Sequence, residues 1–206
     1  MRKKRPLDRS VEILRDTRLV VIASEDKFAV RQYFEFFKSR RIQFKFLETL
    51  DGKSSPEHVF ERLETYLEEF EIGPDDRLWF VSDTDHWAEP NHIQNFVRVI
   101  QLCRDKGIGV AVSNPCFELW LLLHFAEMPS SEMTCEQLAE QIRATVGNYN
   151  KTKIYNLPID GAAVANAIRR ATAVNTGVGE IPASMETRVH LIIDELIDQC
   201  FISIEQ

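Results

Sequence analysis

The chain has 206 residues, of which 44% are hydrophobic and 28% charged, with a net charge of −7 and a pI of about 5.3. This composition is typical of a globular domain with a buried core, and it excludes a protein that holds nucleic acid through overall positive charge. No apolar run is long enough to cross a membrane and none follows the basic start MRKKRPLDRS, so we expect a cytoplasmic protein without a membrane partner.

The first predicted elements alternate between strands and helices. Residues 19–24 form a continuous apolar run, which predicts a strand buried on both faces, and residues 27–40 have apolar side chains at helical spacing. Residues 42–48 alternate between apolar and polar side chains, which predicts a half-exposed strand. A turn and a helix follow, in which Ser55 is the expected N-cap and Pro56 the first helical residue.

The alternation continues through the next segments. Residues 77–82 predict a third buried strand, residues 91–107 a helix closed by its last glycine, and residues 109–113 a fourth strand. Asn114 is then expected to cap a helix whose first residue is Pro115. Strands and helices in this order predict a parallel sheet with helices on its faces.

The pattern changes after residue 128, where only helices are predicted and no further strand is expected. These helices cover residues 134–146, 160–174 and 184–202. The predicted organisation is a basic N-terminal tail over 1–17, an α/β domain over 18–128, and a helical extension over 129–206 packed on the same core.

Acidic residues follow the predicted strands at their carboxyl ends. Glu25 follows the first strand, Asp83 and Asp85 follow the third, and Glu118 lies just beyond the fourth. The carboxyl ends of parallel strands meet at one edge of a sheet, so these four carboxylates should converge there. Like charges at close range repel, and a bound divalent cation relieves the repulsion; oxygen ligands favour Mg²⁺ or Mn²⁺.

The segment AVSNPCFELWLLLHF, residues 111–125, is almost wholly apolar but contains Glu118 and His124. Glu118 lies in the first turn of the predicted helix, where the helix dipole favours an anion, so we expect it to point toward the acidic edge. An ion pair with an arginine of a neighbouring helix is the alternative. His124 lies roughly 120° around the helix from Glu118, and a hydrogen-bonded core histidine is its commoner role.

Taken together, these motifs resemble the RloB-like proteins. The resemblance rests on Glu25, Tyr33-Phe34, Asp83-x-Asp85, SNPCFELWLLLHF, Tyr149-x-Lys151 and, more loosely, TRVHLIIDEL. The RloB-like family is similar to Toprim-domain proteins, whose hallmark is a glutamate after the first strand and a later DxD. The resemblance implies a Toprim-like sheet and a metal-dependent nuclease acting on DNA or RNA. It also implies a role in bacterial defence against phage or mobile DNA, with an ATPase encoded nearby as a partner.

The resemblance also suggests roles for the acidic residues. Asp83 and Asp85 would hold a Mg²⁺ or Mn²⁺ ion, Glu118 would complete or orient the site, and Glu25 would be a ligand or general base. Lys151 would offset the negative charge that develops on the phosphate. Aspartates also favour turns and caps, which is the structural alternative for Asp83 and Asp85.

Four further residues are candidates for contacts with the substrate. Trp87 follows the DxD and could stack on a base. Asn114, Lys153 and His124 are the others, although a helix cap, a solvated loop lysine and a core histidine are their commoner roles. The N-terminal RKKR is the most basic local patch for a phosphate backbone.

One departure from the family pattern leaves a second function open. The family usually reads EGExTEPxYF after the first strand, and this chain reads EDKFAVRQYF, so Asp26 is the only acidic residue close to Glu25. The alternative function is a non-catalytic subunit that binds an ATPase or nucleic acid. A primase-like nucleotidyl transferase is disfavoured because the chain is small.

The cysteines predict reduced thiols. Cys103, Cys116, Cys135 and Cys200 are widely spaced and form no CxxC pair. This spacing argues against a zinc site and against a disulfide framework.

Overall fold

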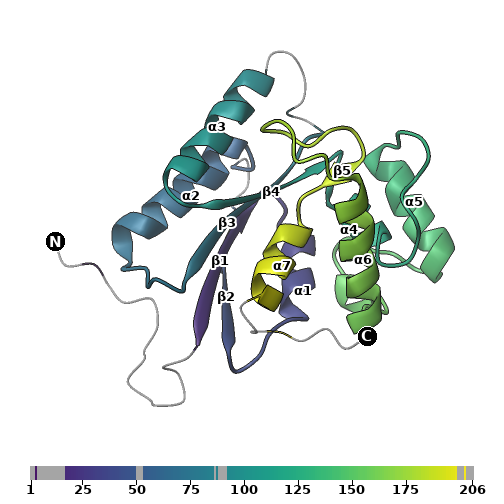
Figure 1. Cartoon of the computed structure of the whole chain (residues 1–206), viewed down its shortest axis with the longest axis horizontal. Helices are drawn as coiled ribbons and strands as arrows, with labels where there is room; N and C mark the ends of the chain where they lie inside the picture. Colours follow the sequence, from purple (N-terminus) through teal and green to yellow (C-terminus); the bar gives the residue numbers. More distant parts are fainter. Residues whose placement is uncertain are drawn as a thin grey trace.

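Five strands form one mostly parallel sheet in this computed structural model, which describes residues 3, 17–49, 53–85, 87, 92–198 and 202. The strands are β1 (Arg18–Ser24), β2 (Ile42–Leu47), β3 (Arg77–Asp83), β4 (Gly109–Asn114) and β5 (Glu186–Thr187). Their order is β2-β1-β3-β4-β5, and only β5 is antiparallel to its neighbour (Figure 1). The predicted α/β class is therefore confirmed.

Helices connect and follow the strands. They are α1 (Ala29–Glu35), α2 (Pro56–Glu69), α3 (Ile93–Asp105), α4 (Phe117–Leu122), α5 (Cys135–Val146), the 3-10 helix η2 (Ile154–Asn156), α6 (Gly161–Val174) and α7 (His190–Asp198). Local sequence explains several of their ends. Ser55 caps α2 by accepting from the backbone N–H of His58, and Gly107 ends α3 at a φ of +69°. Thr134 and Gln137 form a capping box at the start of α5.

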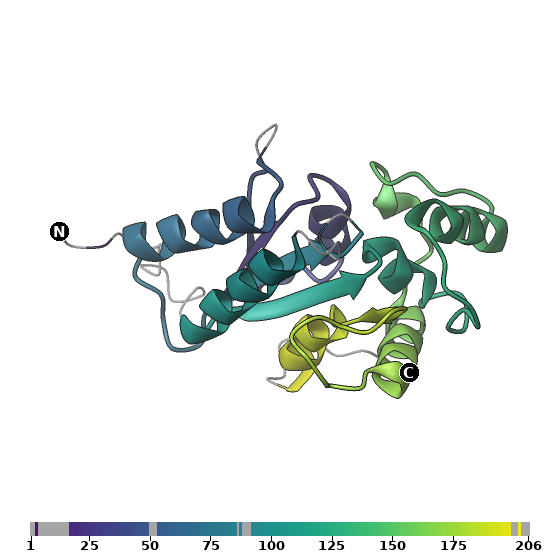
Figure 2. The same ribbon diagram turned by 90° about the horizontal axis from the view of Figure 1, so that it is seen from above.

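The helices cover both faces of the sheet. Alternate residues of β1 point to opposite sides, so Val21 joins the core under α2 and α3, whereas Ile22 joins the core under α1 and α4–α7. Figure 1 shows α2 and α3 at the upper left of the sheet, with α1 and α7 to its right. Figure 2 shows β4 pointing toward α4 and α5, so these two helices lie at the carboxyl edge of the strands.

Some predicted elements are wrong in extent. Helix α1 is shorter than the 27–40 segment, and α7 begins at His190 rather than 184. A strand does follow residue 128, because Thr187 and Glu186 pair with the end of β4. Two residues carry no periodic pattern, so only their contact with β4 reveals this strand.

The expected cap by Asn114 is also wrong. Helix α4 begins at Phe117 with Cys116 at its N-cap position, and no side chain caps it. The side-chain amide of Asn114 instead donates to the carbonyl of Pro182, 3.0 Å away. Asn114 therefore ties the end of β4 to the loop that precedes β5.

The predicted N-terminal tail, including the RKKR patch, lies outside the described residues except for Lys3 and Thr17. Within the described part of the chain, no helix combines the length and the apolar character needed to span a membrane.

Candidate active site

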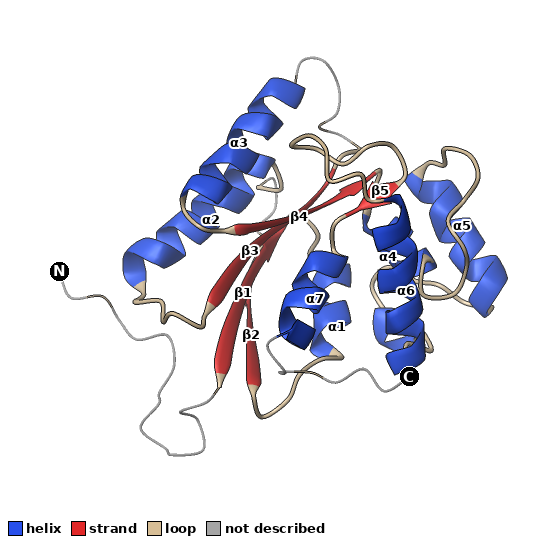
Figure 3. Cartoon of the chain, viewed as in Figure 1, coloured by secondary structure: helices blue, strands red, loops and turns tan. Residues whose placement is uncertain are grey.

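The candidate site lies where the strand order reverses. Strands β1 and β3 are neighbours although β2 separates them in the chain, and ligand sites of open α/β sheets form outside the carboxyl ends at such a switch point (Figure 3). Glu25 directly follows β1, Asp83 ends β3, and Glu118 lies in the first turn of α4 beyond β4. The structure thus brings the predicted acidic residues to one edge.

Glu25 is held by three hydrogen bonds. Its Oε1 accepts from the backbone N–H of Asp83 and from the hydroxyl of Ser82, which is 3.0 Å away, and its Oε2 accepts from Nε1 of Trp87 at 3.0 Å. Burial raises the pKa of Glu25, these hydrogen bonds oppose the rise, and Asp85 adds to it. Trp87, a candidate for base stacking, therefore positions Glu25 through its indole N–H.

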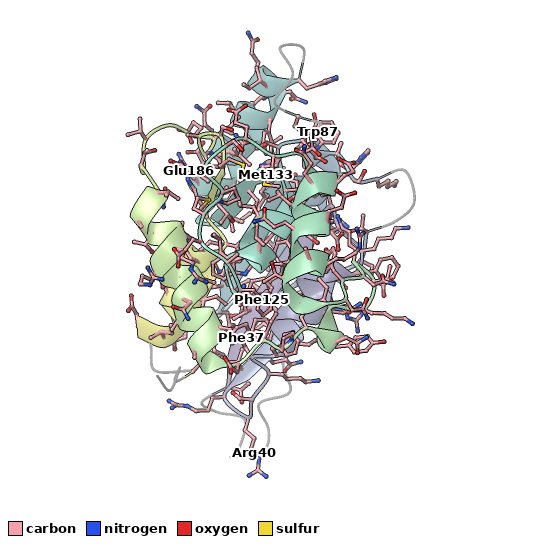
Figure 4. All side chains as sticks on the ribbon, turned by 90° about the vertical axis from the view of Figure 1, so that its right-hand side faces the viewer. Phe37, Arg40, Trp87, Phe125, Met133 and Glu186 are labelled. Atoms are coloured by element: carbon pink, nitrogen blue, oxygen red, sulfur yellow. A yellow bond between two sulfur atoms is a disulfide. The ribbon has the colours of Figure 1, made fainter. Side chains whose placement is uncertain are left out.

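Because Trp87 contacts Glu25, its position shows at which end of the sheet Glu25 lies. Figure 4 shows Trp87 in the upper part of the molecule and Arg40, which precedes β2, at the bottom. The acidic residues therefore gather at the carboxyl end of the sheet, away from the loops that enter the strands.

Asp83 is a buried acid surrounded by other charged groups. The residue is only 8% exposed. Its pKa is raised well above the usual range by burial and then by the charges of Glu25 and Glu118. Lys151 opposes this rise. Asp85 is exposed, and its backbone N–H donates to the carbonyl of Pro115, which holds the DxD turn beside the start of α4.

Glu118 points to this edge and is paired there. Oε1 of Glu118 accepts from the hydroxyl of Tyr149 at 3.0 Å, and Nζ of Lys151 lies 3.5 Å from the same oxygen. Lys151 also lies 3.3 Å from Oδ2 of Asp26. The partner is thus a lysine at the site rather than an arginine of a neighbouring helix.

The charges of these partners depend on one another. Burial and then the charge of Glu118 raise the pKa of Tyr149, which keeps the phenol protonated as a donor. Burial lowers the pKa of Lys151, but Glu118, Asp26 and Asp83 raise it by more, so the ammonium stays charged. Together these six groups, Glu25, Asp26, Asp83, Asp85, Glu118 and Lys151, form what we call the acidic cluster.

The acidic cluster has the donor chemistry of a site for a hard divalent cation. All five acids offer carboxylate oxygens, and Oε2 of Glu118 is buried without a hydrogen-bond partner in the described structure. The spacing is not preformed, because within the described ranges no three His, Cys, Asp or Glu side chains are placed to coordinate one ion. The ammonium of Lys151 takes part of the space between the acids.

Asp26 of the acidic cluster and Tyr149, which donates to Glu118, were not assigned roles from sequence. Asp26 lies in the turn before α1, where its Oδ1 accepts from the backbone N–H groups of Phe28 and Ala29. Tyr149 was noted only as part of Tyr149-x-Lys151. Lys151 lies in a turn closed by the bond from the backbone N–H of Lys153 to the carbonyl of Asn150, so no strand or helix periodicity linked either side chain to Glu118.

The remaining sequence candidates lie elsewhere. His124 is buried in the core, where Nδ1 donates to the carbonyl of Trp120 at 3.0 Å and Nε2 accepts from the hydroxyl of Tyr33 at 3.1 Å. Burial lowers the pKa of His124 to about 4, so the ring is neutral. Lys153 is exposed and immediately precedes η2.

A disulfide lies next to the acidic cluster. Cys116 and Cys135 are bonded, with their Cα atoms 6.0 Å apart, and Sγ of Cys135 lies 3.6 Å from Oδ2 of Asp85. The expectation of reduced thiols is therefore wrong for this pair. Cys103 is free and buried, and Cys200 lies outside the described residues. The error arose because the two cysteines are 19 residues apart and only the packing of α4 against α5 brings them together.

Comparison with known proteins agrees with the motifs. A family model described as "RloB-like protein" matches residues 20–196, a range that contains the whole acidic cluster. No curated protein and no solved structure matches the chain. Because the matched range covers most of the sequence, the chain belongs to the RloB-like protein family.

Proposed function

We propose that this protein is a metal-dependent nuclease that cleaves phosphodiester bonds at the acidic cluster. The observation that carries the proposal is the buried and unpartnered Oε2 of Glu118, close to an Asp83 whose pKa is raised by burial and then by the charges of Glu25 and Glu118. An unused carboxylate oxygen among like charges costs free energy unless a cation binds there. The DNA or RNA substrate and the Mg²⁺ or Mn²⁺ cofactor are parts of this proposal.

The residues of the acidic cluster would share the work as follows. Asp83, Asp85 and Glu118 supply the oxygens that hold the ion, which when bound orients the phosphate and makes water more acidic. Glu25 fixes the backbone of Asp83, and its raised pKa suits it to accept a proton. Lys151 offers its ammonium to a phosphate oxygen on which negative charge develops.

The cellular role is proposed on family grounds. The RloB-like resemblance supports the role of an effector that defends a prokaryotic cell against phage or mobile DNA, with an ATPase as its partner. Family membership alone supports this assignment, and the acidic cluster supports the chemistry.

The test is a cleavage assay with matched acidic variants. Purified wild type, Asp83→Asn and Asp105→Asn are incubated with plasmid, single-stranded DNA and tRNA in Mg²⁺, Mn²⁺ or EDTA. Asp105 ends α3 at the opposite edge of the sheet, so its variant makes the same charge change away from the acidic cluster. We expect metal-dependent cleavage by wild type and Asp105→Asn but not by Asp83→Asn. Equal cleavage by all three would contradict the proposal.

A non-catalytic subunit is the second candidate, and Lys151 favours it. Its ammonium already lies between Asp26 and Glu118, as a permanent counter-ion would. The two functions differ in their response to Mn²⁺. A metal site gains thermal stability as the ion binds, whereas a cluster neutralised by Lys151 does not. Wild type that neither melts higher in Mn²⁺ nor cuts any substrate would favour the subunit.

A further inference from the structure

A groove runs between α1 and the edge strand β2. Two adjoining cavities of about 210 and 270 Å³ form it, and they share Arg31, Phe46 and Glu48. The first cavity also reaches Ser24 and Asp26, so one end of the groove meets the acidic cluster at Asp26. We call it the α1–β2 groove; the residues that define it are Asp26, Arg31, Lys38, Phe44, Lys45 and Phe46.

Aromatic rings line this groove. Phe44 and Phe46 are half-buried, and their rings are stacked with centroids 6.0 Å apart and planes at 18°. The guanidinium of Arg31 lies 6.0 Å from the centre of the Phe46 ring, and its side chain is 56% exposed. Partly open rings beside an arginine are a platform on which unpaired bases stack, whatever their sequence.

The groove is also a basic strip in an acidic protein. Four cations line it, Lys27, Arg31, Lys38 and Lys45, against the three anions Asp26, Glu35 and Glu48. Arg31 and Glu35 pair at 3.1 Å and offset each other, and Lys151 offsets Asp26, which leaves Lys27, Lys38 and Lys45 against Glu48. The net charge of the whole chain is −7, so a local excess of cations marks a surface that suits a chain of phosphates.

We propose that the α1–β2 groove binds a single-stranded nucleic acid and leads it to the acidic cluster. Bases stack on Phe44, Phe46 and Arg31, and phosphates meet Lys38 and Lys45. A duplex keeps its bases paired and cannot use the rings, so the groove selects single strands. The role of the groove in delivering substrate for cleavage rests on the proposed nuclease function, but binding of nucleic acid in the groove does not require cleavage.

The experiment measures binding without cleavage. Fluorescence anisotropy in EDTA follows labelled single-stranded DNA and RNA of about 12 nucleotides, and a hairpin duplex as the comparison. The variants are Lys45→Glu and Phe46→Leu, the second of which keeps an apolar side chain against the core. Arg169→Glu is the control, because Arg169 is an exposed residue of α6, 62% accessible, and the charge change is the same.

We expect single strands to bind more tightly than the duplex. Lys45→Glu should weaken binding and flatten its dependence on salt between about 50 and 200 mM. Phe46→Leu should weaken binding by roughly 5-fold or more, in line with the loss of one stacked base, and Arg169→Glu should bind like the wild type. Binding to wild type that neither groove variant changes, or no preference for single strands, would overturn the inference. Failure of wild type to bind any oligonucleotide would do the same and leave the β2 edge open to a peptide strand.

The outcomes separate this inference from the nuclease proposal. Groove-dependent binding by a protein that never cleaves leaves the inference standing and removes the proposed function. Cleavage that Asp83→Asn abolishes but Lys45→Glu and Phe46→Leu leave unchanged in both KM and kcat keeps the nuclease and removes the groove as the substrate path.

Discussion

Asp83 is a buried acid whose pKa differs between the folded and the unfolded state. Burial, Glu25 and Glu118 raise its pKa in the folded protein, so the folded state holds this proton more tightly than the unfolded chain. The stabilisation from the neutral carboxyl is therefore complete at low pH and is lost as the pH rises through the raised pKa. Replacing the ionisable group removes this loss.

We predict that Asp83→Asn melts at a higher temperature than wild type in EDTA at neutral pH. The difference should shrink toward about pH 4, near the ordinary aspartate pKa. Each kcal/mol recovered raises the melting temperature of a protein of this size by roughly 2–4 °C. Thermal melts of both proteins across pH provide the measurement, with Asp105→Asn as the control. A lower melting temperature for Asp83→Asn at neutral pH would instead indicate a structural cap, whose removal costs roughly 1 kcal/mol.

His124 gives a pH dependence of the opposite sign. Burial lowers its pKa from 6.5 to about 4, so the folded state binds fewer protons than the unfolded chain between these values. Stability should therefore fall as the pH decreases from about 6.5 to about 4, by up to about 3 kcal/mol from this residue. Urea denaturation of wild type and His124→Gln across this range measures the effect. The variant should have the shallower slope, and parallel curves would show that His124 does not titrate as described.

At the scale of elements, the disulfide joins the segment that positions Glu118 to the one that leads to its partners. Cys116 immediately precedes α4, which carries Glu118, and Cys135 begins α5, which runs into the loop with Tyr149 and Lys151. The bond thus tethers two segments that approach each other only through tertiary packing.

We predict that Cys135→Ser lowers the free energy of unfolding by about 3 kcal/mol without reductant, the value for a loop of this length. Adding dithiothreitol should lower wild type to the same level and leave the variant unchanged. Urea denaturation of both proteins with and without reductant makes the comparison. Identical midpoints without reductant would mean that both thiols are reduced in solution.

At the scale of the whole molecule, a buried ion pair fastens the last helix to the sheet. Glu195 of α7 accepts from Arg18 at 2.9 Å and from Arg77 at 2.6 Å, across 177 and 118 residues of chain. The Arg18 side chain is fully buried, and burial lowers its pKa while Glu195 opposes that change. The carboxylate therefore compensates a charge that is costly to bury.

Removing this carboxylate should loosen the packing of α7. We predict that Glu195→Gln destabilises the protein by about 2 kcal/mol, below the full cost of an uncompensated buried charge because Glu195 is 24% exposed. Glu64→Gln is the matched control, since Glu64 pairs with Lys106 on the surface and should change stability by less than about 1 kcal/mol. Chemical denaturation compares the two variants. Equal losses in the free energy of unfolding would show that the pair of Glu195 with Arg18 stabilises the protein no more than a surface pair does.

Local patterns were enough to predict most of the fold. Four strands were predicted because continuous apolar residues mark buried strands and alternating ones mark half-exposed strands. Ser55 and Gly107 mark helix ends, the first through its side-chain oxygen and the second through its positive φ. Strand β5 was not predicted because a strand of two residues has no periodic pattern of its own. The boundaries of α1 and α4 moved because neighbouring segments, not local propensity, decide where a short helix begins and ends.

By itself the sequence determined the α/β class, the family, and the acidic edge formed by Glu25, Asp83 and Glu118, because the carboxyl ends of parallel strands must meet. Only the tertiary structure decided what surrounds those carboxylates. Trp87 on Glu25, and Tyr149 with Lys151 on Glu118, are contacts between segments distant in the chain. The Cys116–Cys135 bond is of the same kind. Such pairings depend on how helices pack on the sheet, and the spacing of residues along one chain carries no direct record of that packing.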